Sequence, residues 1–210
     1  MARVLGISGS NRQGGNTSIL VERALSAAEE FGAEVEFIEI ADVEINPCKH
    51  GLNCYELGRC IQDDGLNPII ARMSEAHGII FGSPVHYSSV TSQMKNFMDR
   101  AGRFAHLEGK IGAALVVARK SGSDNALNQL IFFMLVKEMI IPGGVSWPVG
   151  FAMNVGDIRK DTEAMRMAQQ MGRRVAALSD TVAKLPVPWY YEPRPDDEKA
   201  RFGDEWRTTA

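Results

Sequence analysis

The chain has 210 residues and a formal net charge of −3. This length suits one domain with its own core, and the lack of a basic excess argues against nucleic acid as a partner. The longest apolar runs, Ile111–Ala118 and Leu130–Val136, are shorter than the roughly 20 residues that span a bilayer. We therefore expect no membrane partner, and because Met1 is followed by no signal-peptide pattern we expect a cytoplasmic protein.

Apolar runs of strand length alternate along the chain with segments of helical period. Strands are expected at Arg3–Ile7, Glu34–Ile40, Gly78–Gly82, Ile111–Ala118 and Met139–Pro142. Helices are expected at Thr17–Phe31, Asn67–His77, Val90–Phe104, Ala126–Lys137 and Asp161–Leu185. Right-handed crossovers then predict an α/β, doubly wound, five-stranded parallel sheet with helices on both faces. Ligands bind such sheets beyond the carboxyl ends of the strands, which directs attention to the loops after strands one, three and four.

The loop after the first strand combines glycines with short polar side chains and opens a helix. Glycines in this loop let the backbone approach a ligand closely, and the helix N-terminus adds N–H groups and a positive dipole end. There is no Walker A loop and no G-x-G-x-x-G fingerprint, so the loop favours a terminal monophosphate. The alternative is a polar turn that caps the helix through Asn16 or Thr17. The candidate phosphate ligands are Ser8, Ser10, Arg12, Gly15, Asn16, Thr17 and Ser18.

The loop after the third strand offers a surface for a flat heteroaromatic ring. It reads Pro84, Val85, His86, Tyr87 and Ser88, which places apolar and aromatic groups beside backbone amides. Taken alone, the pair His86 and Tyr87 would suit an ordinary exposed loop. Its expected position beside the phosphate loop favours ring binding.

The segments Ser8–Ser18 and Gly82–Arg100 resemble the NADPH-dependent FMN reductase family, and within it the iron–sulfur flavoproteins. The resemblance covers Val4 to Leu185 and implies a flavodoxin-like fold. It further implies that the first loop binds the FMN phosphate and that residues 84–88 line the isoalloxazine ring. The loop after strand four, with Arg119, Ser121 and Gly122, would close over the flavin. The family usually has Tyr-Phe or Tyr-Gly where this chain reads His86-Tyr87-Ser88, so an imidazole could donate to the ring where a phenol usually lies.

The resemblance implies an oxidoreductase that passes electrons from NAD(P)H through FMN to a flavin, quinone or other acceptor, small molecule or protein. FMN carries the chemistry, and we name no catalytic side chain. Arg119 and Lys120 could hold a nicotinamide phosphate or form a solvated basic turn. Two alternatives stay open: a non-enzymatic electron carrier of the flavodoxin type, and an FMN-dependent dehydrogenase of a small metabolite.

Three cysteines, Cys48, Cys54 and Cys60, lie within thirteen residues. Iron–sulfur flavoproteins carry four in this loop, and here Gly51 occupies the second position. A [4Fe–4S] cluster needs four thiolates or a substitute ligand, for which His50 is adjacent to the gap. Three thiolates with His50 would also suit zinc. We favour a degenerate loop whose cysteines pack or line the flavin pocket, so we expect no metal and treat the cysteines as weak candidates.

The remaining expectations concern assembly. The segment Leu130–Val136 is apolar all round, which indicates either a helix buried in its own domain or a face that contacts a second subunit. The resemblance implies a homodimer or a larger homo-oligomer. We expect residues 1–185 to form the FMN-binding domain and 186–210 to be a tail that is flexible or docks on a neighbouring subunit.

Overall fold

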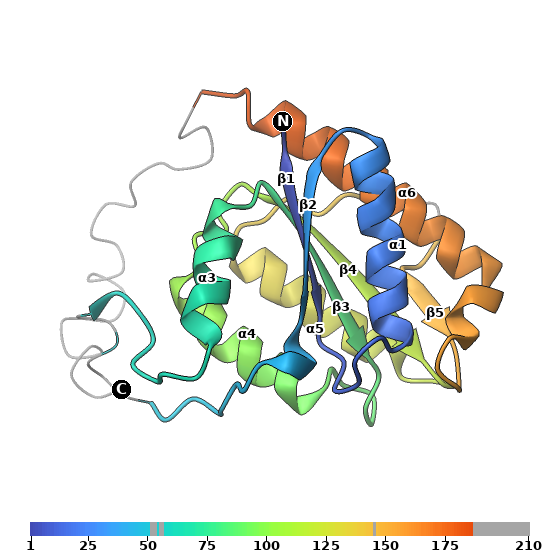
Figure 1. Ribbon diagram of the computed structural model, residues 1–210, viewed down its shortest axis with the longest axis horizontal. Helices are drawn as coiled ribbons and strands as arrows, with labels where there is room; N and C mark the ends of the chain where they lie inside the picture. The colour runs from blue at the N-terminus through green and yellow to red at the C-terminus, as the bar shows by residue number, and fades with distance from the viewer. Residues whose placement is uncertain (51–53, 55–56, 145, 187–210) are drawn as a thin grey trace.

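The computed structural model describes residues 1–50, 54, 57–144 and 146–186, which form one parallel sheet flanked by helices (Figure 1). The strand order is β2-β1-β3-β4-β5. The strands are β1 (Arg3–Ser8), β2 (Glu34–Glu39), β3 (Gly78–Pro84), β4 (Ile111–Ala118) and β5 (Val149–Phe151). The helices are α1 (Asn16–Glu30), α3 (Leu66–Glu75), α4 (Ser92–Phe104), α5 (Ser123–Val136) and α6 (Thr162–Val182), with short 3₁₀ turns η1 (Ile40–Asp42) and η2 (Asp157–Lys160). This confirms the predicted doubly wound, flavodoxin-like α/β fold.

Two apolar cores lie on the two faces of the sheet. Helices α1 and α6 cover one face, and α3, α4 and α5 cover the other (Figure 1). The pair α1 and α6 packs closely because α6 carries Gly172 at the crossing, where an added Cβ would lie 1.8 Å from the Ala24 carbonyl oxygen. The strands between the two layers are covered on both faces, which explains why all eight residues of β4 are buried.

The strand register brings three strand ends to one edge of the sheet. Ser8 at the end of β1 pairs with Gly82 of β3, and Pro84 at the end of β3 pairs with Val117 of β4. The loops after β1, β3 and β4 therefore emerge side by side, as the topology predicted.

The predicted position of the fifth strand was wrong. Residues Met139–Pro142 form only an isolated bridge, in which Ile140 pairs with Ile111 at the start of β4. The chain then leaves the sheet edge at Pro142, which has no N–H to donate, and returns as β5 beside Val116–Ala118. The carboxyl end of β4 therefore pairs with Val149–Phe151 and not with the predicted segment Met139–Pro142.

Helix α5 keeps an apolar surface on its outer side. Leu127, Leu130 and Met134 are buried, whereas Phe132 is 64% exposed and Val136 is 80% exposed. The helix is therefore not wholly enclosed by its own domain in this chain. Of the predicted tail, 186–210, all residues after Pro186 lie outside the described residues. Among the residues that the structure describes, no helix is long and apolar enough to cross a membrane.

Candidate functional site

A cavity of about 540 Å³ lies where the loops after β1, β3, β4 and β5 meet. It contains nine of the predicted ligand residues: Ser10, Arg12, Gly15, Asn16, Thr17, Pro84, Val85, His86 and Arg119. The sequence analysis missed the rest of its lining: Asn11, Val117, Ala118, Ala152, Met153, Asn154 and Val155. The volume falls within the range of small-molecule and cofactor sites, which is about 300–1,000 Å³.

The start of α1 faces this cavity without a side-chain cap. Gly15 occupies the N-cap position and makes no side-chain hydrogen bond, and the first turn holds no acidic residue. The first intrahelical bond is donated by Ile19 to the Gly15 carbonyl, at 3.0 Å. The backbone N–H groups of Asn16, Thr17 and Ser18 therefore have no intrahelical acceptor, which is the arrangement that binds phosphate groups. Capping by Asn16 or Thr17, the alternative considered from the sequence, does not occur.

Two predicted ligands, Ser8 and Ser18, lie behind the loop instead of in the cavity lining. Their hydroxyls lie 2.9 Å apart, and Ser18 also donates to the Glu39 carboxylate. The same carboxylate accepts the Gly14 N–H at 3.1 Å. These contacts give both serines a role in shaping the loop, through a carboxylate at the end of β2.

The Asn16 side chain is engaged with the loop that follows β5. Its Nδ2 donates to the Asn154 carbonyl at 2.8 Å, and its Oδ1 accepts from the N–H groups of Gly156 at 2.9 Å and Ile158 at 3.3 Å. Asn16 therefore lines the cavity but uses its side chain to close one wall. That wall also carries the exposed apolar side chains of Met153 and Val155.

A tight turn forms the rim after β3. The Val85 N–H donates to the Val117 carbonyl at 2.9 Å, and His86 and Ser89 exchange hydrogen bonds of 2.9 and 3.0 Å. Tyr87 and Ser88, between them, have φ values of 49° and 59°, which is the conformation of a type I′ turn. Because the amides of Val85 and His86 are bonded within the protein, the amides of Tyr87 and Ser88 are the turn's remaining donors toward a ring.

The turn is held against the loop after β4. A Cβ added at Gly122, whose φ is 83°, would lie 2.4 Å from Ser88 Oγ. Tyr87, Ser88 and Ser121 line a second, shallower cavity of about 330 Å³ together with Val85, Arg119 and Lys120. Of the predicted ligands after β3 and β4, Tyr87, Ser88 and Ser121 thus belong to this neighbouring cavity, and Gly122 sets the spacing of the two loops.

Charge in the main cavity favours an anion. Its described lining includes two guanidinium groups, Arg12 and Arg119, and no carboxylate. The backbone N–H groups at the start of α1 add to the positive potential. The site therefore suits a phosphate ester attached to a flat, partly apolar group that contacts Pro84 and Val85.

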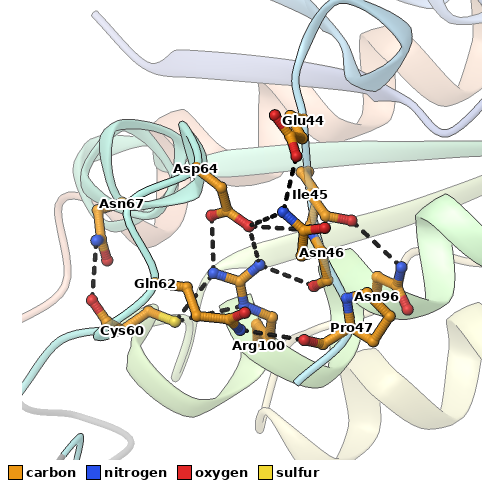
Figure 2. Close-up of polar contacts among 10 residues, drawn as sticks. All are labelled: Glu44, Ile45, Asn46, Pro47, Cys60, Gln62, Asp64, Asn67, Asn96 and Arg100. Atoms are coloured by element: carbon orange, nitrogen blue, oxygen red, sulfur yellow. Dashed lines mark hydrogen bonds and ion pairs between the residues drawn. The ribbon is translucent and has the colours of Figure 1, made fainter. Parts of the chain in front are cut away.

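A second polar cluster surrounds Arg100 of α4 (Figure 2). Arg100 is 1% exposed and forms a two-point ion pair with Asp64, with distances of 2.5 and 2.8 Å. Its Nε and Nη2 donate to Cys60 Sγ at 3.3 and 3.0 Å, and its Nη1 donates to the Asn46 carbonyl at 2.8 Å. All five N–H groups of the guanidinium thus have acceptors.

The Asp64 carboxyl is shaped by this cluster. Burial alone would raise its pKa, but hydrogen bonds from Arg100 and Asn46 and the charge of Arg100 outweigh that effect. The pKa of Asp64 therefore lies below its ordinary value. The hydrogen bond to Asp64 raises the pKa of Arg100 against the opposing effect of burial, and Cys60 adds to the rise.

The cysteine segment contacts the face of α4 that carries Arg100 and Arg103. Arg103, one turn beyond Arg100, donates to Cys54 Sγ at 3.3 Å. Cys54 and Cys60 are buried, Cys48 is half-buried, and none of the three forms a disulfide. Gly51 lies outside the described residues. Within the described part of the chain, no three His, Cys, Asp or Glu side chains converge as metal ligands. The described residues therefore do not fit a four-thiolate cluster.

The chain is similar to known proteins over most of its length. Residues 2–154 match the model of the NADPH-dependent FMN reductase family. The chain belongs to that family. It is 37% identical over 192 residues to an iron–sulfur flavoprotein of Methanocaldococcus jannaschii, covering 87% of this chain and 100% of that protein. It is 30% identical over 189 residues to an iron–sulfur flavoprotein of Methanosarcina thermophila, covering 87% and 97%.

Solved structures extend the fold comparison. RosB with bound 8-demethyl-8-formylriboflavin-5′-phosphate matches with a TM-score of 0.71 at 15% identity, covering 96% of this chain and 87% of that one. The apo form of the NADH:FMN oxidoreductase EMOB matches with a TM-score of 0.64 at 19% identity, covering 94% and 100%. At these identities the likeness shows the fold, and the family match supports an FMN-binding flavoprotein.

The strained turn makes a first prediction. A non-glycine residue in the left-handed region costs roughly 1–2 kcal/mol, so Ser88→Gly should stabilise the protein by up to about 1 kcal/mol after the added chain entropy of glycine. Thermal unfolding should show a midpoint that is higher by about 2–4 °C. Ser121→Gly, in the facing loop but without a positive φ, should lower the midpoint slightly. A lower midpoint for Ser88→Gly would contradict the assigned strain.

The buried ion pair makes a second prediction. Asp64→Asn leaves the Arg100 charge without its counter-charge, which should cost about 3–5 kcal/mol of unfolding free energy at neutral pH. Because the Asp64 pKa is depressed, this stabilisation is complete above its ordinary value of 3.8 and is lost as the pH falls through the folded-state pKa. The difference in unfolding free energy between Asp64→Asn and wild type should therefore shrink in acid. Urea unfolding at neutral pH and at a pH below the folded-state pKa of Asp64 measures this change.

The matched control lies on the same helix. Asp99 pairs with Lys95 but is 45% exposed, so Asp99→Asn should cost less than about 1 kcal/mol. Equal costs for Asp64→Asn and Asp99→Asn would refute the role given to the buried pair.

Proposed function

We propose that the protein is an FMN-dependent oxidoreductase that passes electrons from NAD(P)H to a flavin, quinone or other acceptor. The observation that carries this proposal is the uncapped start of α1, which opens with Arg12 into a cavity lacking carboxylates in its described lining. That arrangement suits the phosphate of FMN without a metal ion. The family match supports the same cofactor.

The chain's own groups divide the work of binding. The N–H groups at the start of α1, Ser10 and Arg12 would hold the phosphate, and Glu39 keeps the loop in place from behind. Pro84 and Val85 would lie against the ring. The neighbouring cavity shares Val85 and Arg119 with the main one, so the Tyr87 and Ser88 amides would donate to the edge of the ring where the two cavities adjoin. When bound, FMN supplies the chemistry, since it takes up a hydride and releases electrons to an acceptor. Arg119 and Lys120, at the neighbouring cavity, would bind the phosphate groups of the nicotinamide donor.

The test measures binding and turnover in one preparation. The protein should bind FMN more tightly than riboflavin, and Arg12→Gln should weaken FMN binding about tenfold while changing riboflavin binding little, because a charge-assisted bond to phosphate is lost. With FMN bound, NAD(P)H should be oxidised in the steady state when a quinone or free flavin is added. Arg173→Gln, on α6 and paired with Glu30, is the control and should leave both affinities unchanged.

The outcomes separate the alternatives. Protein that does not bind FMN would refute the proposal. Protein that binds FMN but does not oxidise NAD(P)H would be an electron carrier or a dehydrogenase of another metabolite.

We further infer that the outer face of α5 contacts a second copy of the chain. Phe132 and Val136 are largely exposed there, and Leu135 between them is 53% exposed. Exposed apolar patches of this kind mark protein contacts.

Substitution of one exposed phenylalanine tests this inference. Phe132→Glu should convert the dimer to a monomer in sedimentation or light scattering, with the thermal midpoint little changed. Phe31, which is 55% exposed at the end of α1, provides the matched control, and Phe31→Glu should leave the dimer intact. A wild-type monomer, or a dimer that survives Phe132→Glu, would exclude this interface.

A further inference from the structure

The cysteine segment of this chain departs from what the names of its relatives indicate. Both archaeal relatives are iron–sulfur flavoproteins, and a [4Fe–4S] cluster takes four thiolates. The whole sequence holds three cysteines. Gly51 occupies the second of the four positions at which the resemblance expects cysteine, so the thiolate count is short by one.

The described residues supply no substitute for the missing fourth thiolate of a cluster. His50 is adjacent to Gly51 in sequence, but no group of three His, Cys, Asp or Glu side chains converges in the described ranges, whose gaps here are 51–53 and 55–56. The three sulfurs and His50 are therefore not arranged as a common coordination sphere.

The sulfur of Cys60 instead completes the surroundings of a buried cation. Arg100 is 1% exposed, so each of its N–H groups needs an acceptor, and an unpaired one would cost the full desolvation of that group. Asp64 and the Asn46 carbonyl accept three of the five N–H groups, and Cys60 Sγ accepts the other two (Figure 2). The Cys60 carbonyl is itself bonded by Asn67 Nδ2 at 3.0 Å, which fixes the residue on its other side.

The second arginine repeats the contact one turn along the helix. Arg103 lies three residues after Arg100, so the two guanidinium groups share one face of α4. They donate to Cys60 and Cys54, which are 6% exposed each. Two of the three cysteines thus have a role in attaching the segment to α4 that requires no metal.

We propose that this chain carries no iron–sulfur cluster, and that Cys60 and Cys54 hold the cysteine segment on α4 as hydrogen-bond acceptors for Arg100 and Arg103. The proposal concerns the cysteine segment alone and does not depend on the activity proposed above.

Anaerobic reconstitution tests the absence of the cluster. Full-length wild type, Cys48→Ser and Gly51→Cys are incubated with ferrous iron, sulfide and a thiol reductant, desalted, and assayed for iron, acid-labile sulfide and flavin per chain. Wild type should retain no more iron and sulfide than Cys48→Ser, which removes one thiol. Gly51→Cys restores the four-cysteine pattern and should retain both, with a broad absorbance beneath the flavin bands.

The outcomes for iron are separate from those for flavin. Stoichiometric iron in wild type, with or without sulfide, overturns the proposal. Background iron in wild type supports it whether or not Gly51→Cys binds a cluster. Flavin content, measured in the same samples, reports on the proposed function and leaves the iron result unaffected.

Thermal unfolding tests the positive half of the proposal. Cys60→Ala removes the acceptor of two buried N–H groups and should lower the midpoint by several degrees, and Cys60→Ser, which keeps an acceptor, should recover part of the loss. Cys48→Ala is the matched control and should change the midpoint little. Equal midpoints for Cys60→Ala and Cys48→Ala would overturn the role given to the Cys60 sulfur.

Discussion

The buried hydroxyl of Thr91 connects the parts from which the cavity is built. Its Oγ1 donates to the Gly9 carbonyl in the loop after β1, at 2.7 Å, and accepts the Met94 N–H as the cap of α4, at 3.0 Å. The Thr91 N–H donates to Ser83 Oγ at the end of β3, at 3.3 Å. One fully buried residue therefore sets the distance between the loop after β1 and the turn after β3, the two segments proposed to hold the phosphate and the ring. Because each bond lies in the dry interior, its geometry is maintained before any ligand arrives.

Charge is distributed so that the loop is fixed from one side and open on the other. Glu39 accepts hydrogen bonds from Gly14 and Ser18 on the protein side of the loop, while Arg12 and the first N–H groups of α1 face the cavity. The Glu39 carboxylate accepts the Gly14 N–H, so that amide is not available to an anion in the cavity. The donors that remain, Arg12 and the first N–H groups of α1, lie at the cavity. This arrangement explains why a loop with several hydroxyl groups presents few of them to the ligand.

The fold was predictable because β1, β3 and β4 are continuous apolar runs and α1 has a clear helical period. The fifth strand was not, because β5 has only three residues and its pairing with β4 depends on where the chain returns after Pro142. The error hid one wall of the cavity. The role of the Asn16 side chain depends on partners about 140 residues away, Asn154 and Gly156. No local sequence pattern reveals such a contact. The arginine partners of the cysteines were missed for the same reason.

Helix α4 joins the two polar regions of the molecule. It is capped by Thr91, beside the turn that follows β3, and carries Arg100 and Arg103 on its later turns. Removal of the acceptors of a buried guanidinium costs about 3–5 kcal/mol, which is a large share of the roughly 5–15 kcal/mol that keeps a domain folded. As long as Arg100 stays buried, the stability of the fold is by itself enough to require Asp64 and Cys60. Two of the three cysteines can therefore be retained without a cluster, because Arg100 and Arg103 of α4 use their sulfurs as hydrogen-bond acceptors.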